Sequence, residues 1–337
     1  MLAAVITRPG APEVLEVREV AAPVPGTEQI LVRVRASALN RADLHQRRGQ
    51  YPAPPGVPSD IPGMEYAGDV VALGPGAREW REGDRVFGLV GGGGQAEYVV
   101  VHERTAMRIP DTLDWIAAAA VPEAFITAHD ALLQANARPG ETALVHAVGS
   151  GVGLAAVQLA RAFGLRALGT ARTASKLDHA RAHGMAAGLA VDRATATDAR
   201  ALATALGDFA RAHGGPAGGV DVALDLVGGA YTNATLHALA PLGRLMLIGL
   251  VGGAETPLEL GRVLRGRLTV RGTVMRARAL EERIAVARRF AAEVLPLLAA
   301  GTVRPTIDRT YPLAEIAAAH ERLESNETVG KVVVSVG

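Results

Sequence analysis

Residues 167–176, ALGTARTASK, combine hydrogen-bond donors in a pattern that favours the binding of an anion. A short apolar stretch is followed by Thr170, Arg172, Thr173 and Lys176, and no acidic residue lies among them. A guanidinium forms charge-assisted, often bidentate hydrogen bonds with phosphate, and hydroxyl groups add further donors. Cations at a helix start oppose the helix dipole, which argues against charges that only solvate that helix. We therefore expect this cluster to bind a phosphate group.

A glycine-rich turn, VGSGVG, lies between an expected strand at 142–147 and an expected helix, GLAAVQLARAFG. Glycines at such a turn permit a tight reversal, let the backbone approach a pyrophosphate, and let the helix start pack close to the sheet. A G-x-G-x-x-A spacing runs through Gly151, Gly153 and Ala156, and a second register from Gly149 to Gly153 stays open. The strand and the helix around the turn favour a dinucleotide site over a turn that only packs.

The two features together indicate which dinucleotide binds. In a strand–turn–helix unit of this type, the residue that ends the second strand lies beside the adenosine ribose, and an acid there binds the 2′-hydroxyl of NAD. ALGTARTASK carries Arg172 and Lys176 and no acid. A carboxylate would repel a 2′-phosphate, whereas an arginine fork accepts one. The sequence therefore predicts NADPH as the cofactor.

Short strands dominate the chain up to about Pro110. The segments LAAVIT, LEVREV, ILVRVRASAL, YAGDVVALG, DRVFGLV and QAEYVVV are separated by turns that contain Pro or Gly. Residues 50–62 carry five prolines, and we expect them to form an exposed, stiff loop. This pattern predicts a β-rich domain.

From Thr142 onward, apolar strands alternate with helices, which predicts an α/β fold with a doubly wound parallel sheet. Between the two parts, DTLDWIAAAAVPEAFITAHDALLQA is helical in period and interrupted at Pro122. A long amphipathic helix is expected at 280–300, followed by IDRTYPLAEIAAAHERLES and a last strand, KVVVSV. This C-terminal part is not another strand–helix repeat, and we expect it to pack on the β-rich domain.

Composition excludes several classes of function. The 337 residues suffice for two domains, and the net charge of +1 argues against nucleic acid or a membrane surface as partner. The absence of cysteine excludes disulfides, thiolate zinc sites and cysteine nucleophiles. The first apolar run ends at Arg8-Pro9-Gly10, too short for a signal peptide or a membrane span, so we expect a cytoplasmic protein. No G-x-S-x-G motif supports a hydrolase.

Eight stretches resemble one family and occur in its order: SALNRADLHQRRGQYPAPPG, PGMEYAGDV, GDRVFGLVGGGGQAEYVVV, PEAFITAHDALL, VHAVGSGVGLAAVQLARAFG, DVALDLVGG, IGLVGG and ESNETVGK. Together they resemble the medium-chain dehydrogenase/reductase superfamily and, within it, the zinc-free, zeta-crystallin-like NADPH:quinone oxidoreductases. The chain is most similar to the tumour-suppressor-inducible subgroup, which shares NRAD-x-x-QR-x-G-x-Y and IDR-x-YP. The resemblance covers essentially the whole chain.

The resemblance implies a GroES-like substrate domain made of residues 1–122 and 275–337, and a Rossmann cofactor-binding domain made of residues 123–274. It also implies an active-site cleft at their junction and a homodimer joined through the Rossmann sheets. Zinc-dependent relatives use a cysteine near the NRAD position and a His-Glu pair in the G-x-E-x-x-G motif. Here Met64 stands in place of the histidine, so Glu65 cannot build a three-ligand zinc site, and no metal is expected.

Without a metal to polarise a carbonyl, the implied acceptor is already electrophilic: a quinone, a conjugated enone or an enoyl thioester. Asn40 and Tyr51 are expected to flank the nicotinamide and the substrate, with Thr127 beside them. The Tyr51 phenol is suited to donate to a carbonyl oxygen, or it only packs in its loop. The resemblance assigns the remaining site residues to the cofactor: Ser150, Gly151, Val152 and Gly153 to the pyrophosphate, Arg172, Thr173 and Lys176 to the adenosine end, Ile248, Gly249 and Leu250 to the nicotinamide, and Asn326 to the cofactor from the C-terminal segment.

Three points depart from the family pattern or remain open. His129 stands where relatives have an aromatic residue; a satisfied surface histidine is the simpler interpretation, and a proton donor is the alternative. Asp192 stands near the site where the subgroup has a tyrosine, and Arg172 is expected to compensate for it. The main prediction is an NADPH:quinone oxidoreductase; the alternatives are an enoyl reductase and an NADPH-binding structural or sensor protein with little turnover.

Overall fold

All 337 residues are described by the computed structural model, in which they form two compact units. The first unit comprises Met1–Ile126 and Met275–Gly337, and the second comprises Thr127–Val274. A π-helical turn at Pro122–Ile126 contacts strands β4 (Glu65–Leu73) and β5 (Arg85–Leu89). Residues 123–126 therefore belong to the first unit, although the sequence assigned them to the second.

The first unit is built on a seven-stranded sheet of order β14-β15-β3-β4-β5-β7, in which β6 also pairs with β3. Strands β1 and β2 form a separate antiparallel pair. The bounds of the other strands of this unit are β1 Leu2–Ile6, β2 Leu15–Glu19, β3 Gln29–Ala38, β6 Tyr98–His102, β7 Met107–Arg108, β14 Ile307–Pro312 and β15 Lys331–Ser335.

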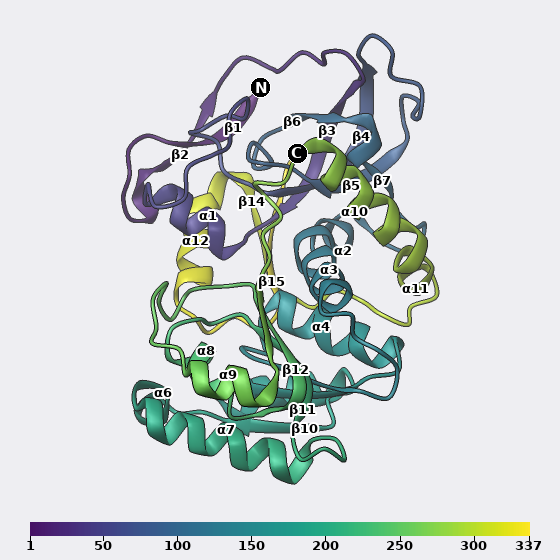
Figure 1. The fold of residues 1–337 in the computed structure, drawn as a ribbon. Helices are drawn as coiled ribbons and strands as arrows, with labels where there is room; N and C mark the ends of the chain where they lie inside the picture. Colours follow the sequence, from purple (N-terminus) through teal and green to yellow (C-terminus); the bar gives the residue numbers. More distant parts are fainter. The chain divides into compact units, whose positions relative to one another are not determined.

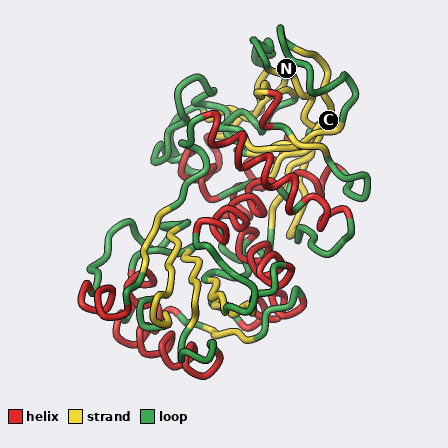
Figure 2. The backbone as a smooth tube through the Cα atoms, turned by 45° about the vertical axis from the view of Figure 1, so that its right-hand side comes forward, coloured by secondary structure: helices red, strands yellow, loops and turns green.

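Strand β3 is the centre of this sheet. Its alternate residues Ile30, Val32 and Val34 are buried in the core of the unit, as the apolar–polar alternation of the sequence predicts. It pairs antiparallel with β4, β6 and β15. The pairing with β15 brings the last strand of the chain against an early one, which confirms that the C-terminal part packs on the β-rich domain. Figure 2 shows the C-terminus beside strands.

The helices of the first unit are α1 Arg41–Arg47, α2 Trp115–Ala119, α10 Leu280–Glu293, α11 Leu295–Ala299 and α12 Ile316–Glu324. The single helix expected at 280–300 is in fact two, because Pro296 lacks an N–H and its ring clashes with the preceding turn. Helix α1 was not expected, since its seven residues RADLHQR are almost all polar and only Leu44 supplies a buried apolar side chain.

The second unit contains a six-stranded parallel sheet of order β10-β9-β8-β11-β12-β13. Because β8 is its first strand in the sequence, this is the 3-2-1-4-5-6 order of a doubly wound nucleotide-binding sheet. The prediction of a parallel sheet is confirmed. The strands are β8 Thr142–Val145, β9 Arg166–Ala171, β10 Ala187–Ala190, β11 Val220–Asp225, β12 Leu239–Leu247 and β13 Thr269–Gly272.

Helices cover both faces of this sheet, with α4 and α7 on either side of the strands (Figure 1). Leu202, Leu206 and Phe209 of α7 are buried in a core that also contains Leu144 of β8 and Leu168 of β9. None of the helices has the length and hydropathy to span a bilayer. The helices of this unit are α3 Thr127–Gln134, α4 Gly151–Ala162, α5 Ala174–Ala182, α6 Arg193–Thr197, α7 Ala199–His213, α8 Ala230–Thr235 and α9 Leu260–Gly266.

Candidate cofactor and substrate sites

The carboxyl ends of the central strands in the second unit gather the residues expected at the cofactor. β8 lies between β9 and β11, so the strand order reverses there. Ligands of doubly wound sheets bind at such a switch point, outside the carboxyl ends of the strands. The residues 150–153 follow β8, 172–176 follow β9, and 248–250 follow β12. All three predicted cofactor segments of this unit therefore share one edge of the sheet.

The glycine turn after β8 is shaped for close approach of the backbone. A Cβ added to Gly153 would lie 2.7 Å from the carbonyl oxygen of Ala147, so no side chain fits there. Ser150 caps helix α4, its Oγ accepting the Gly153 N–H at 3.1 Å. The N–H groups of Gly151 and Val152, in the first turn of α4, have no partner within the helix. They form a site suited to a pyrophosphate oxygen.

Lys176 lies directly over this turn. A Cβ added to Gly149 would lie 2.9 Å from Cβ of Lys176, so the lysine stem packs on the glycine. Thr173 caps α5 and accepts the Lys176 N–H at 3.4 Å, which leaves its own O–H proton able to donate elsewhere. Arg172 is exposed just beyond the end of β9, and its charge acts on the phenol of Tyr231. Burial, the larger effect, raises the pKa of Tyr231 to about 12.

Thr170 does not belong to this donor cluster, which corrects the interpretation of ALGTARTASK. Its side chain is buried, and its Oγ1 lies 2.9 Å from Nδ1 of His146. Nε2 of His146 lies 2.8 Å from Oγ1 of Thr235, which itself donates to the carbonyl of Tyr231. His146 Nε2 must then be the donor to Thr235, and its Nδ1 accepts the Thr170 proton. Burial lowers the pKa of His146, which fits this neutral, bonded histidine.

Asp225 fixes the two loops where the nicotinamide is expected. Its buried carboxylate accepts the N–H groups of Val227 and Gly228, each at 2.9 Å. Its backbone carbonyl accepts the N–H of Ile248 at 2.8 Å and that of Gly249 at 3.2 Å. A Cβ added to Gly249 would lie 2.6 Å from the carbonyl of Leu226, so only glycine fits this approach of two strand ends. Leu250, just beyond, is 54% exposed.

These features fit a nicotinamide dinucleotide that bears an additional phosphate. The turn after β8 offers backbone donors, and the segment after β9 offers a guanidinium, an ammonium and a hydroxyl. Asp192, which the sequence suggested as an obstacle, has its Oδ1 bonded to the Thr195 N–H at 2.7 Å as the cap of α6. That hydrogen bond lowers the pKa of the Asp192 carboxyl. The negative charge of Asp192 therefore compensates the positive end of the α6 helix dipole.

In the first unit, a buried ion pair organises the residues expected near the substrate. Nζ of Lys331 lies 2.7 Å from Oε1 of Glu65, and these side chains are 5% and 0% exposed. The ammonium also donates to Oδ1 of Asn40 at 2.5 Å and to the carbonyl of Leu39 at 2.9 Å. Nδ2 of Asn40 donates to the same Glu65 oxygen at 2.8 Å. Asn40, predicted at the substrate, is therefore held by both charges.

Two more carboxyl groups lie close to this pair. Asp43 in α1 is fully buried, and its oxygens accept the N–H groups of Asn40 at 2.7 Å and Gly63 at 2.9 Å. Burial still raises the pKa of Asp43 to about 6. Glu123 lies in the π-helical turn, and its N–H donates to Oε2 of Glu65 at 2.7 Å. Burial and, next, the charge of Glu65 raise the pKa of Glu123 to about 8. We call Asp43, Glu65 and Glu123 the carboxyl cluster.

Tyr51 is held by Arg276, which is 7% exposed. The guanidinium lies 4.8 Å from the centre of the Tyr51 ring, and Nη1 donates to the Tyr51 carbonyl at 3.2 Å. Nε donates to the carbonyl of Gly91 at 2.7 Å, and Nη2 to Oε1 of Gln46 at 2.6 Å. Partial burial raises the pKa of Tyr51, with the charge of Arg276 opposing it. Tyr51, near the start of the proline-rich loop, is therefore stacked on a cation and stays a neutral phenol.

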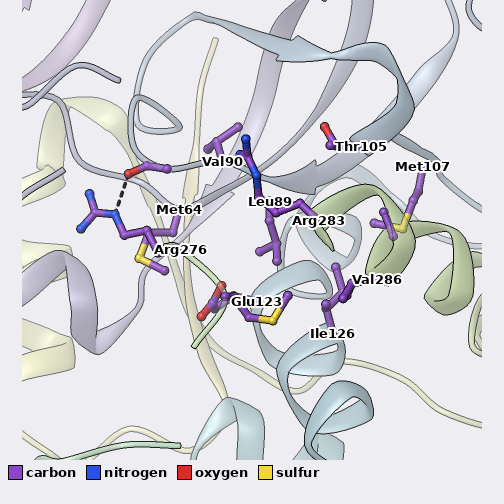
Figure 3. Close-up of a pocket in the computed structure, with 13 residues that line it drawn as sticks. Met64, Leu89, Val90, Thr105, Met107, Glu123, Ile126, Arg276, Arg283 and Val286 are labelled. Carbon is purple, nitrogen blue, oxygen red and sulfur yellow. Dashed lines mark hydrogen bonds between the residues drawn. The ribbon is translucent and has the colours of Figure 1, made fainter. Parts of the chain in front are cut away.

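A small cavity of about 30 Å³ lies beside Arg276 and Glu123 (Figure 3). In the figure, Glu123 lies on the side of Met64 and Arg276, away from Met107. The walls are mainly apolar; they consist of Met64, Leu89, Val90, Gly91, Thr105, Met107, Glu123, Ile126, Met275, Arg276, Arg283, Val286 and Ala287. The cavity therefore places one carboxyl group among thioethers and aliphatic carbons.

The side chains of the first unit do not fit a catalytic zinc ion. Such a site needs three protein ligands from Cys, His, Asp or Glu, and no group of three in the molecule has a suitable arrangement. Oε1 of Glu65 is occupied by the ammonium of Lys331 and by Asn40. Met64, at the histidine position of the family motif, is a buried thioether on the wall of the cavity.

The other predicted residues lie as follows. Thr127 is the first residue of the second unit, and its buried Oγ1 has no hydrogen-bond partner. Asn326 has a positive φ of 62°, and its Oδ1 accepts from Arg41 at 2.6 Å. His129 is 1% exposed, with its ring 5.9 Å from that of Phe163, so the expected surface histidine is wrong.

Lys331, Glu123, Arg276 and Asp43 were not singled out in the sequence. Lys331 and Glu123 lie inside motifs that carried the family resemblance, SNETVGK and PEAFITAHDALL. The only local signal was an acid in an otherwise apolar helical stretch, AVPEAFI. Nothing in the chain near Arg276 indicates that it reaches the Gly91 loop, because that contact spans 185 positions.

Comparison with known proteins agrees with this architecture. Residues 26–111 match the model of the alcohol dehydrogenase GroES-like domain, and residues 195–334 match that of the zinc-binding dehydrogenase family. A quinone oxidoreductase of Pseudomonas aeruginosa is 35% identical over 329 residues, covering 96% of each chain. The crystal structure of the quinone oxidoreductase from Thermus thermophilus, also solved with NADPH, is 34% identical with a TM-score of 0.81 and covers 99% of this chain and 100% of that one. The CurK enoyl reductase is 25% identical with a TM-score of 0.84, covering 100% and 99%.

Proposed function

Because this chain belongs to the medium-chain dehydrogenase/reductase family and is an oxidoreductase, we propose that it is an NADPH-dependent quinone oxidoreductase that works without zinc. The observation that carries this proposal is the Lys331–Glu65 pair. It places a fixed ammonium, bonded to three acceptors, on Glu65, the glutamate of the motif in which zinc-dependent relatives carry their His-Glu pair. The NADPH complex of the Thermus thermophilus relative supports the choice of cofactor.

NADPH supplies a hydride to the acceptor when it is bound. This chain binds and orients the cofactor: Gly151 and Val152 offer backbone donors to the pyrophosphate, and Arg172, Thr173 and Lys176 to the 2′-phosphate. Gly249 lets the ends of β11 and β12 approach closely, at the edge where the nicotinamide is proposed to bind. Positioning of two reactants accounts for much of the catalysis in such a reaction, since effective molarities correspond to about 7–11 kcal/mol.

The acceptor is proposed to be a quinone because nothing in the first unit polarises an unactivated carbonyl as a Lewis acid does. A quinone is electrophilic without such help. Tyr51, stacked on Arg276, is proposed to donate a hydrogen bond from its phenol to the carbonyl oxygen on which charge develops. Asn40 is proposed to line the nicotinamide, with its amide fixed by Lys331 and Glu65.

A second candidate is reduction of conjugated enones or enoyl thioesters. The specific observation in its favour is the presence of two neutral acids in the first unit, Tyr51 and Glu123, since an enolate needs a proton more than a reduced quinone does. The similarity to the CurK enoyl reductase is consistent with it. A third, an NADPH-binding sensor or structural protein, differs from both in having no substantial turnover.

The test is oxidation of NADPH and of NADH, measured side by side with an ortho-quinone, a para-quinone and an enoyl thioester. Fast turnover of NADPH with a quinone is the expected result. Turnover with the thioester alone identifies the enzyme as an enoyl reductase. Tight NADPH binding with background turnover for every acceptor favours the sensor, and a preference for NADH contradicts the role of Arg172.

We also propose that two copies of the chain associate through the second unit. Strand β13 is an edge of the parallel sheet and pairs only with β12. On the neighbouring helix α9, Leu260 and Leu264 are 71% and 78% exposed. A free strand edge beside exposed leucines supports burial against the same surface of a second copy.

A further inference from the structure

Glu123 carries a buried polar atom that nothing in the fold uses. Its Oε2 is shielded from solvent and has no hydrogen-bond partner. An unpartnered carboxyl oxygen costs free energy comparable to a lost hydrogen bond, and such groups in native structures call for an explanation. The residue also lies in a single π-helical turn, Pro122–Ile126, a distortion that occurs often at functional sites.

The charged groups around Glu123 come from four separate segments. Glu65 of β4 and Asp43 of α1 oppose ionisation of its carboxyl, whereas Lys331 of β15 and Arg276 favour it. The ammonium of Lys331 is already bonded to Glu65 at 2.7 Å, so its charge is largely compensated there. Glu123 also acts on the Tyr51 phenol, and Arg283 of α10 lines the same cavity. Glu123 is therefore the carboxyl of the cluster with an oxygen that neither a cation nor a hydrogen-bond donor contacts.

The cavity beside Glu123 is small and apolar. Its volume of about 30 Å³ exceeds the about 10–15 Å³ that a cavity needs to hold one water molecule. It therefore has room for the oxygen atom of a carbonyl group. The thioethers of Met64, Met107 and Met275 offer no hydrogen bond to that oxygen. The lining also includes Arg283, whose Nε is buried without a hydrogen-bond partner and can add a hydrogen bond to the same oxygen.

We propose that the Glu123 carboxyl is the proton donor that completes reduction of the acceptor, whose carbonyl oxygen enters this cavity. The proposal rests on the proposed function. The hydride and its electron pair leave the nicotinamide C4–H bond and reduce the acceptor to its anion. The anionic oxygen takes the Glu123 proton, the O–H bond of the carboxyl breaks, and the carboxylate that remains regains a proton from solvent. The pKa of about 8 keeps this acid protonated at neutral pH.

The direct test is the protonation state of Glu123 by infrared difference spectroscopy, wild type minus Glu123→Gln, between pH 6 and pH 10. A protonated-carboxyl band present at pH 7 and lost near pH 8 is expected. Glu281→Gln is the matched control, because that exposed acid of the same unit pairs only with Arg104 at the surface. A carboxylate band for Glu123 already at pH 7 overturns the proposal, and this measurement needs no turnover.

The kinetic test compares wild type, Glu123→Gln, Tyr51→Phe and the control with a conjugated enone and a quinone. General acids contribute about 10²–10⁴-fold, so Glu123→Gln should lower kcat for the enone at least about tenfold, with a smaller loss for the quinone. The wild-type rate should fall as pH rises through about 8, because the donor deprotonates, and Glu123→Gln should lose this pH dependence. The thermal midpoint of each variant shows whether it is folded.

The outcomes separate the two claims. Unchanged kcat and pH profile in Glu123→Gln, with loss in Tyr51→Phe, assign the proton to Tyr51 and overturn the role of Glu123 while the proposed function stands. Absence of turnover by the wild type with every acceptor overturns the proposed function, and the donor role with it. If Glu123→Gln does not fold, the pH profile of the wild type and ¹³C chemical shifts of its labelled glutamates decide: no titration near pH 8 contradicts the proposal.

Discussion

Replacing Lys331 by methionine should destabilise the first unit by several kcal/mol. The change keeps an unbranched side chain that is one atom shorter and removes its charge, so Glu65 is left as a buried carboxylate with no ion-pair partner. Both side chains are at most 5% exposed, and the ammonium makes three hydrogen bonds within 2.5–2.9 Å. Breaking a buried pair by removing one partner costs about 3–5 kcal/mol. A domain is ordinarily stable by about 5–15 kcal/mol, so about a fifth or more of its stability is at stake.

The assay is urea unfolding followed by tryptophan fluorescence. Trp80 and Trp115 are the only tryptophans, and both belong to the first unit, so their signal reports that unit alone. Arg104→Met is the matched control: its pair with Glu281 has side chains 39% and 72% exposed, and exposed pairs contribute about 0–1 kcal/mol. The double variant Lys331→Met/Glu65→Gln should lose clearly less than the two single losses combined, because each residue's cost depends on the other.

A loss below about 1 kcal/mol in Lys331→Met, equal to that of Arg104→Met, would refute the reasoning. It would mean that the Lys331–Glu65 pair does not stabilise the first unit. The pair would then not hold Asn40 and the other residues expected near the substrate in place. Additive losses in the double variant would lead to the same conclusion.

Two further changes test the cofactor and the association of chains. Arg172→Ala should raise KM for NADPH about 10- to 100-fold, because a charge-assisted hydrogen bond contributes a free energy of that size. KM for NADH should change little. Arg211→Ala, on the exposed face of α7, is the control. An equal effect on both cofactors would mean that Arg172 does not bind the 2′-phosphate. Leu260→Glu combined with Leu264→Glu should convert a dimer into single 34.8 kDa chains in light scattering, whereas an unchanged mass would place the interface elsewhere.

Periodicity and glycine chemistry were sufficient to predict most of the fold. The parallel sheet followed from apolar runs buried on both faces, and the turn at 148–153 from the needs of a tight strand-to-helix reversal. Helix α1 escaped prediction because its start depends on Asp43, whose carboxylate bonds the Asn40 N–H and reaches the distant Gly63 N–H. Pro296 indicates a break in the helix expected at 280–300. The amphipathic pattern continues across this proline, and for that reason a single helix was predicted.

The candidate site was predicted less completely, for a reason visible in Thr170 and Lys331. Both are polar residues in strands, and the sequence does not say which of them finds a buried partner. Thr170 is hydrogen-bonded to His146, 24 positions away, so its hydroxyl is not available to a cofactor. Lys331 bonds Glu65, 266 positions away, and lies at the centre of the residues that were expected near the substrate. The charge state of Glu123 likewise depends on burial and on groups that only the tertiary fold assembles.

The most direct test of the central claim is NADPH oxidation with a para-quinone after exhaustive dialysis against a strong zinc chelator. The chain has no cysteine, and its substrate side has an ammonium bonded to Glu65, so full activity should remain, and added zinc should not increase it. Activity that disappears with the chelator and returns with stoichiometric zinc would contradict the account, because it would require a metal site that these side chains do not provide.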